Sequence, residues 1–241
     1  MLLLALALAP GIAIMLYIYF KDQYNREPIK NLLISFLLGV LSIVPAVIVS
    51  LSLTAVLKNY LSESGLLYNL LLAFIAVSFS EEGSKYLMLR TYAFRKKAFD
   101  EPFDGIIYSV MVSMGFATLE NILYVTEHGI GTAILRMFLS VPAHAAFGVL
   151  MGYHVGLARF DPLKRVSHLW KGLLLAVFFH GAFDFFLFLQ ESKEVTQYVS
   201  AGLLVLGALV SYFFAIRISM KSIRLHRELS RIQFEKEKEP A

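Results

Sequence analysis

Two glutamates and one lysine lie in an apolar part of the sequence, in the stretch SFSEEGSKY at residues 78–86. On a helix, Lys85 follows Glu81 by four residues and Glu82 by three, so both carboxylates lie beside the amine. The ammonium can neutralise one carboxylate, and two adjacent carboxylates in a low dielectric do not both ionise cheaply. One glutamate is therefore predicted to be available as a general base.

Three later apolar runs carry polar groups of the same kind: Glu120 with Asn121, then His144, then His180 with Asp184. The last two are four residues apart, so the carboxylate can fix the tautomer and orientation of the imidazole. An ionisable side chain near the centre of a bilayer costs roughly 2.5–3.5 kcal/mol on insertion scales. At 1.5 Å of rise per residue, these groups fall at similar depths in their helices. The sequence predicts that they converge on one site able to deprotonate a water and stabilise an oxyanion.

Each feature also has a structural interpretation. A Glu–Lys pair can be a packing clamp, and a single histidine can be a satisfied interior side chain. Asn121 can join two helices by hydrogen bonds, worth about 0.6 kcal/mol on average in membranes. The joint occurrence of these groups on four successive runs favours a functional site.

The elements that carry these groups are apolar runs near 2–20, 31–57, 66–89, 104–126, 132–157, 170–189 and 196–216. Each is long enough, at about 17–25 residues, to cross a bilayer. With 58% hydrophobic residues and a mean hydropathy of +0.66, the chain is too apolar for a soluble domain of 241 residues. The first run lacks a basic leader and is predicted to be a retained helix rather than a cleaved signal peptide. The predicted fold is all-α, a polytopic bundle of about seven transmembrane helices.

The basic residues predict the orientation of this bundle. Eighteen Lys and Arg lie in 21–30, 90–103, 158–171 and the segment from Arg217, against three in the alternate loops and ends. Positive charge marks the cytoplasmic side, so the N-terminus is predicted outside and the C-terminus in the cytoplasm. The net charge of +4 is then a topology signal, and the bilayer rather than nucleic acid is the expected partner.

Two domains are predicted: a transmembrane domain over residues 1–216, and a basic cytoplasmic tail over 217–241. Apolar residues recur in the tail at helical spacing among Lys, Arg and Glu. An amphipathic helix on the inner leaflet and a solvated, partly frayed tail are both compatible with this pattern.

Several catalytic classes lack their signatures. The sequence has no cysteine, no H-E-x-x-H and no G-x-S-x-G, and no Gly-Asp or Tyr-Asp pair lies in an apolar run. No cofactor is predicted. His144, His180 and a carboxylate offer nitrogen and oxygen ligands that zinc accepts, so a metal site stays open as an alternative.

Four motifs in order resemble the PrsW family: EEGSK at 81–85, FATLEN at 116–121, HAAFG at 144–148 and HGAFD at 180–184. FDGIIYSVMVSMGF, which contains Asp104 and Gly105, is also similar to that family. The motif core covers residues 66–190. The resemblance implies a bacterial multi-pass protein of the cell membrane, a glutamic-type intramembrane protease related to the CAAX-prenyl endopeptidases. Those relatives have a histidine where this chain has Glu120, whose role stays open as ligand, base or structural acid.

The resulting hypothesis is an intramembrane endopeptidase whose base is Glu81, with Glu82 held by Lys85 as its electrostatic support. The reverse assignment of the two glutamates stays open as an alternative. His144 and His180 would orient the water or stabilise the oxyanion, Asp184 would orient His180, and Asn121 would donate to the oxyanion. The resemblance implies single-pass membrane proteins as substrates, for instance an anti-sigma factor. Two alternatives are a proton- or cation-coupled transporter, and a scaffold that binds a partner helix along Gly148 and Gly152. A transporter would show paired halves, and the hydropathy shows none.

Overall fold

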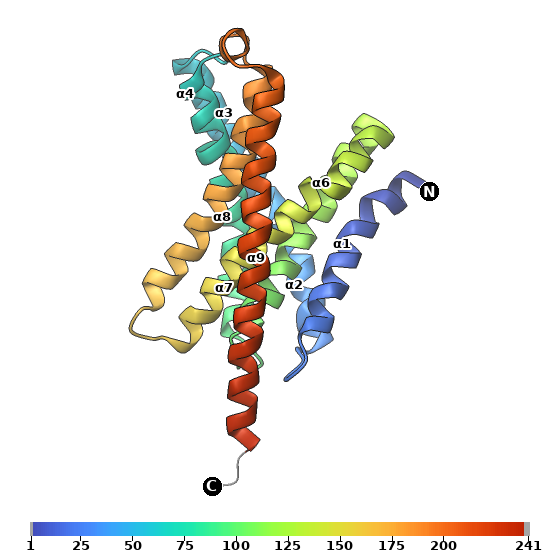
Figure 1. The fold of residues 1–241 in the computed structure, drawn as a ribbon, viewed down its shortest axis with the longest axis vertical. Coiled ribbons are helices and arrows are strands. Elements are labelled where there is room, and N and C mark those ends of the chain that lie inside the picture. The colour runs from blue at the N-terminus through green and yellow to red at the C-terminus, as the bar shows by residue number, and fades with distance from the viewer. Residues whose placement is uncertain (1, 239–241) are drawn as a thin grey trace.

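The computed structural model describes residues 2–238, and all regular secondary structure in that range is helical (Figure 1). The α-helices are α1 (Leu2–Lys21), α2 (Ile29–Leu41), α3 (Ile43–Tyr60), α4 (Leu66–Leu71), α5 (Ser80–Thr91), α6 (Asp104–Phe138), α7 (Ser140–Phe160), α8 (Arg165–Phe188) and α9 (Ala201–Lys238). A π-helical segment, η1 (Leu72–Phe79), joins α4 to α5, and three short 3-10 turns complete the structure at Ala93–Arg95, Leu189–Glu191 and Val195–Gln197.

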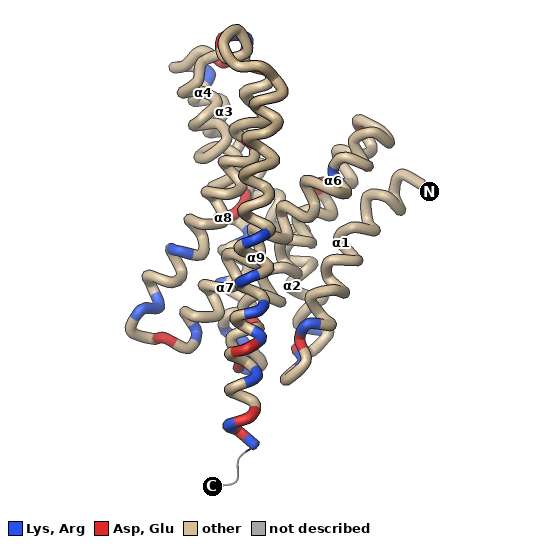
Figure 2. Tube along the Cα trace, in the orientation of Figure 1, with Lys and Arg blue, Asp and Glu red and all other residues tan. Residues whose placement is uncertain are grey.

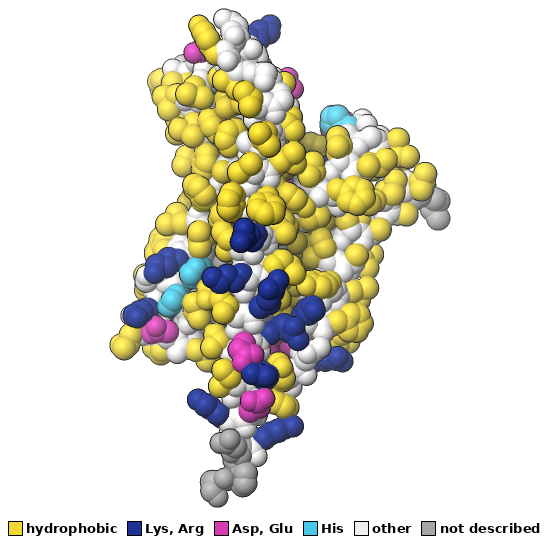
Figure 3. Space-filling model, viewed as in Figure 1, with side chains coloured by type: hydrophobic (Ala, Val, Ile, Leu, Met, Phe, Trp, Pro, Cys, Tyr) yellow, Lys and Arg dark blue, Asp and Glu magenta, His cyan; other side chains and the backbone are white. Residues whose placement is uncertain are grey.

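Six stretches of these helices are long and apolar enough to cross a membrane. Their outward faces carry large exposed side chains, such as Leu37, Ile48 and Leu206. In Figure 3 hydrophobic side chains cover most of the visible face, whereas charged side chains gather toward the lower end. An apolar surface of this extent is stable in lipid rather than in water. The chain is therefore a multi-pass membrane protein, as predicted.

The fourth of these stretches, Asp104–Phe160, contains two passes joined by a turn at Gly129. Gly129 has φ 78° and ψ −160°, a backbone conformation that suits glycine because it has no Cβ. The chain reverses there, so that Ala133 packs in one cluster with Val125 and with Ala7 of α1. The α2–α3 pass is interrupted at Ser42 but continues through it. Counting the two passes of Asp104–Phe160 separately gives seven, which agrees with the number predicted.

Helix α6 lies in the middle of the bundle and packs against α1, α2 and α7. Glycines let these backbones approach closely. A Cβ at Gly152 of α7 would lie 2.3 Å from the Gly105 carbonyl oxygen of α6, and a Cβ at Gly148 would lie 2.9 Å from Ser113 Cβ. Helices α6 and α7 can therefore approach this closely only because Gly148 and Gly152 have no side chain.

Helix α9 continues past Arg217 without a break and buries Ser222, His226 and Ser230 against the body of the protein. Lys and Arg are concentrated along its lower part and in the loops nearby (Figure 2). A separate tail beginning at residue 217, and the orientation of the bundle in the membrane, stay predictions.

Candidate active site

The two adjacent glutamates begin α5, directly after the π-helical segment η1. In a π-helix the backbone bonds from i to i+5, and such segments occur frequently at functional sites. Ser78 follows this wider spacing, since its hydroxyl donates to the Ala73 carbonyl at 2.6 Å. At the start of α5, Glu82 is fully buried, whereas the Glu81 side chain is 14% exposed. The two carboxylates therefore have different surroundings although they are neighbours in sequence.

Lys85 is the centre of the network. Its Nζ lies 2.7 Å from Glu82 Oε1, 3.5 Å from Glu81 Oε2 and 3.2 Å from His144 Nδ1, and it sits 4.1 Å from the centre of the Phe116 ring. An ammonium can only donate, so His144 Nδ1 accepts and the imidazole proton lies on Nε2. That Nε2 is 3.0 Å from Glu120 Oε2 and donates to it. The lysine thus fixes the tautomer of His144.

His180 lies between two carboxylates. Its Nδ1 is 2.9 Å from Glu82 Oε1, and its Nε2 is 3.2 Å from Asp184 Oδ2 and 3.9 Å from Glu81 Oε2. The predicted contact with Asp184 is present, and Glu82 on the opposite edge of the ring is an additional partner. Phe147 stacks on the ring at 4.9 Å. These contacts hold His180 in one orientation with Nε2 toward Glu81.

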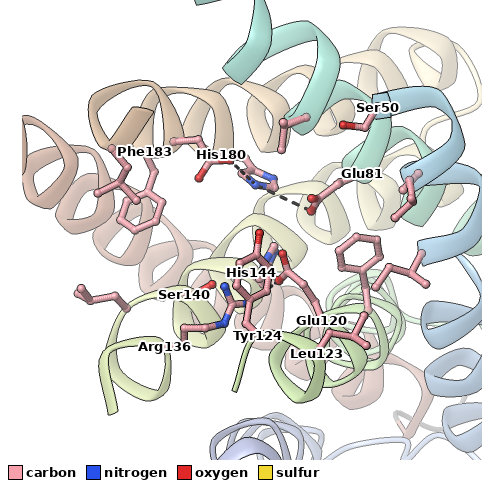
Figure 4. A pocket seen from close by; sticks show the side chains of 18 of the residues that line it. Ser50, Glu81, Glu120, Leu123, Tyr124, Arg136, Ser140, His144, His180 and Phe183 are labelled. Atoms are coloured by element: carbon pink, nitrogen blue, oxygen red, sulfur yellow. Dashed lines mark hydrogen bonds and ion pairs between the residues drawn. The ribbon is translucent and has the colours of Figure 1, made fainter. Parts of the chain in front are cut away.

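A cavity of about 550 Å³ opens beside these groups. Figure 4 shows Glu81, His180, His144, Glu120 and Arg136 turned toward a common space. Its remaining walls are mostly apolar, and some of them are exposed at the outer surface of the bundle, including Leu51 (65%) of α3 and Leu135 (63%) of α6. The polar groups are therefore reachable from the apolar surface of the protein.

Asn121 lies outside this cavity. Its side chain is completely buried, its Nδ2 donates to the Ala7 carbonyl of α1 at 2.8 Å, and its Oδ1 accepts from Arg136 Nε at 2.9 Å. This is the structural interpretation of Asn121, in which its hydrogen bonds join two helices. Five of the eight predicted site residues line the cavity: Glu81, Glu120, His144, His180 and Asp184. Glu82 and Lys85 contact these residues from behind, and Asn121 supports Arg136.

Arg136 is a site residue that the sequence pattern did not single out, because it entered only as one of the three basic residues in the alternate loops and ends. Its Nη2 lies 2.6 Å from Glu120 Oε2, and its guanidinium stacks 4.3 Å from the Tyr124 ring centre. The turn at Gly129 brings it back beside Asn121 and Glu120, which lie fifteen and sixteen residues earlier in the chain. A signal existed in the sequence: Arg136 is the one Lys or Arg within the apolar run 132–157.

The charges of the site do not balance by ion pairing alone. Four carboxylates, those of Glu81, Glu82, Glu120 and Asp184, share two permanent cations, Lys85 and Arg136. Because uncompensated charge is costly in a low dielectric, the site retains protons among its carboxyl and imidazole groups. A site that binds and exchanges protons beside an accessible cavity is suited to hydrolysis by general acid–base catalysis.

A helical membrane protein with an acid–histidine centre at an accessible cavity has the architecture of an intramembrane hydrolase. The chain belongs to the PrsW family: the family model described as PrsW family intramembrane metalloprotease matches residues 27–220. It is 40% identical to Protease PrsW of Geobacillus kaustophilus (strain HTA426) over 78% of this chain and 81% of that protein. It is also 40% identical to Protease PrsW of Bacillus subtilis (strain 168), over 77% and 82%. No solved structure is significantly similar. The protein is an intramembrane protease of a bacterial membrane, as the motifs predicted.

The family description names a metal, and Glu81, Glu82, His144 and His180 place ligand atoms within 4.8 Å of one another. A metal ligand needs a free lone pair. His144 accepts from Lys85 at Nδ1 and donates to Glu120 from Nε2, while His180 has a carboxylate at each nitrogen. Glu82 Oε1 is already bonded to Lys85 and His180. This arrangement does not fit a four-ligand metal centre, because a metal would have to displace the lysine from it.

Proposed function

We propose that the protein is a glutamic-type protease in which Glu81 is the general base. The observation that carries this proposal is the different environment of the two adjacent glutamates. Glu82 is fully buried and bonded to Lys85 and His180, whereas Glu81 faces the cavity and makes only a long contact with the lysine. A base must reach the water it deprotonates, and of the two adjacent glutamates Glu81 alone lines the cavity.

In the proposed reaction a water binds between Glu81 and His180, whose Oε2 and Nε2 are 3.9 Å apart. The two atoms are too far apart for a direct hydrogen bond, which leaves both free to bond a water at the edge of the cavity. Glu81 takes a proton from the water as the oxygen of the water attacks the carbonyl carbon of the scissile peptide. Glu81 then returns the proton to the leaving nitrogen as the C–N bond breaks. The products are a carboxylic acid and an amine.

Two groups are placed to stabilise the oxyanion of the tetrahedral intermediate. The Arg136 guanidinium and the Nε2–H of His144 both line the cavity and both now donate to Glu120. Preorganised donors in a site sheltered from water contribute strongly to such catalysis. We assign to Glu120 the role of holding these two donors in position.

We further propose that the substrates are single-pass membrane proteins. The apolar walls of the cavity, together with its exposed rim at Leu51 and Leu135, suit a peptide segment that arrives from the lipid phase. An anti-sigma factor is a candidate substrate on the resemblance to the family alone.

The test is cleavage of a tagged single-pass substrate by the purified full-length protein in liposomes, with and without a strong zinc chelator. We expect cleavage to persist after metal removal at an unchanged rate. Loss of activity with the chelator, recovered on addition of zinc, would contradict the glutamic mechanism and establish the metal-dependent one.

A further inference from the structure

A second group of buried acids, remote from the catalytic cavity, lies where α1, α2 and α6 meet their connecting loops. We call it the acid cluster; its members are Asp22, Glu27, Glu101 and Asp104. Asp22 and Glu27 belong to the α1–α2 loop, Glu101 to the loop before α6, and Asp104 to the first turn of α6. Each residue is at most 4% exposed.

Most members of the acid cluster use one carboxylate oxygen to fix their position. Asp22 Oδ2 accepts from the Glu27 backbone N–H at 3.0 Å. Asp104 Oδ2 accepts from the backbone N–H groups of Asp100 at 2.8 Å and Glu101 at 2.7 Å. Glu27 Oε2 accepts from the Tyr108 hydroxyl. The positions of the carboxylates are thus determined by the fold.

The second oxygen of each carboxylate has no partner. Four atoms are buried without a hydrogen bond in the structure: Asp22 Oδ1, Glu27 Oε1, Glu101 Oε1 and Asp104 Oδ1. Buried polar atoms of native proteins nearly always have a partner, so four in one cluster require an explanation.

In the part of the chain that the structure describes, no basic side chain is paired with the acid cluster. Within residues 2–238 none of its four carboxylates forms an ion pair. Arg26 is nearby, but its Nε donates to the Asp22 backbone carbonyl at 3.2 Å. Buried charges are paired or coordinate metals, because isolated ones are too costly.

The ligand atoms of Asp22, Glu101 and Asp104 lie within 4.8 Å of one another. All are carboxylate oxygens, which are the ligands of hard cations such as Mg²⁺, Ca²⁺ and Mn²⁺, and no histidine or thiol is available to favour zinc. We propose that Asp22, Glu101 and Asp104 bind one hard divalent cation, with Glu27 beside it as a fourth acidic group. The ion joins the α1–α2 loop to the loop before α6 and to the start of α6, the helix that carries Glu120.

Protons are the competitors for this site. Burial raises the pKa of Asp22 to about 6, and burial together with the neighbouring acids raises the pKa of Glu101 to about 8. Without a cation the cluster would therefore hold protons near neutral pH, and binding is best measured at pH 8 or above.

The direct test is Mn²⁺ binding to the purified full-length protein in detergent at pH 8, followed by electron paramagnetic resonance. We expect one bound ion per chain, displaced by Mg²⁺ or Ca²⁺ and lost in Asp22→Asn and Glu101→Gln. The double variant Glu81→Gln/His180→Ala should still bind it, because the catalytic centre is elsewhere. Absence of binding to the wild type, or binding that persists in both acid-cluster variants, would overturn the proposal.

Thermal unfolding separates a cation site from a merely structural cluster. A ligand present at about 100 times its Kd should raise the wild-type Tm by roughly 5 °C or more. Asp22→Asn should be at least as stable as the wild type without a cation, because it relieves repulsion, and should not respond to the cation. Asp100→Asn, which changes an exposed acid of the same loop, should respond like the wild type. If the Tm of Asp22→Asn lay below the wild-type Tm by the same amount with and without the cation, the proposal would be contradicted.

Discussion

At the scale of single residues, Lys85 decides what its neighbours can do. Its ammonium bonds Glu82 closely, contacts Glu81 only at 3.5 Å, and fixes the tautomer of His144. The roles proposed for the two glutamates follow from this unequal sharing of one cation, and a substitution of each glutamate tests them.

The first prediction distinguishes the two glutamates. Glu81→Gln keeps the shape of the side chain but removes the base, so cleavage per folded molecule should fall by about 10²–10⁴-fold with little change in Tm. Glu82→Gln should instead lower the Tm, because the buried Lys85 loses its closest partner. The measurements are cleavage rate per folded molecule and thermal unfolding of both variants. Normal cleavage by Glu81→Gln would exclude it as the base.

The second prediction concerns Arg136, which the proposed reaction uses as an oxyanion donor. Arg136→Ala should reduce kcat by about 10²–10³-fold, the usual loss for one such donor. Arg136→Lys keeps the charge beside Glu120, so it should fold normally and recover part of kcat with little effect on KM. The contradicting outcome has two parts: Arg136→Lys folds better than Arg136→Ala, and Arg136→Ala keeps the full kcat per folded molecule. The arginine would then serve only to neutralise Glu120.

At the scale of the elements, the site depends on a reversal of the chain within α6. The turn at Gly129 directs residues 130–138 back along α6, and this return places Arg136 beside Glu120. The π-helical segment η1 has a comparable role, since it precedes the first turn of α5 where both glutamates lie.

The third prediction tests this turn. Gly129 has a conformation that other residues adopt only with strain, so Gly129→Ala should destabilise the protein by about 1–3 kcal/mol and misplace Arg136. Gly131→Ala is the matched control, because its Cβ would also meet open space but its φ is not positive. It should be neutral or slightly stabilising, by up to about 1 kcal/mol. Chemical unfolding and cleavage rates of the two variants provide the comparison, and equal behaviour would contradict the role of the turn.

At the scale of the whole molecule, the apolar surface and the one-sided distribution of basic residues define a protein that crosses the membrane repeatedly. Figure 2 shows Lys and Arg concentrated toward one end of the bundle, where the connecting loops and the last part of α9 meet. The acid cluster lies among the loops at that end, where its side chains are buried.

The fourth prediction is the orientation itself. A reporter that is active only in the cytoplasm should work when fused after Lys238 and fail when inserted at Ser64, while a reporter active only outside should behave oppositely. The physical reason is the eighteen-to-three distribution of basic residues between the two sides. The reverse pattern would place the acid cluster outside the cell and contradict the predicted topology.

Much of this organisation is determined by the sequence alone. The lengths of the apolar runs determine the seven passes. Spacings of three and four residues determine the contacts Glu82–Lys85, Glu81–Lys85 and His180–Asp184, because neighbours on one helix depend only on the local chain. Ordered motifs then identify the family.

The contacts between helices were decided only by the tertiary structure. No spacing indicates that Asn121 turns away to the Ala7 carbonyl, that Glu82 bonds His180 of another helix, or that Arg136 returns to Glu120. The same holds for the acid cluster, whose members lie as far apart as residues 22 and 104. Such contacts depend on how each helix is rotated about its axis and where its turns lie, and these are fixed by packing of the whole bundle rather than by local periodicity.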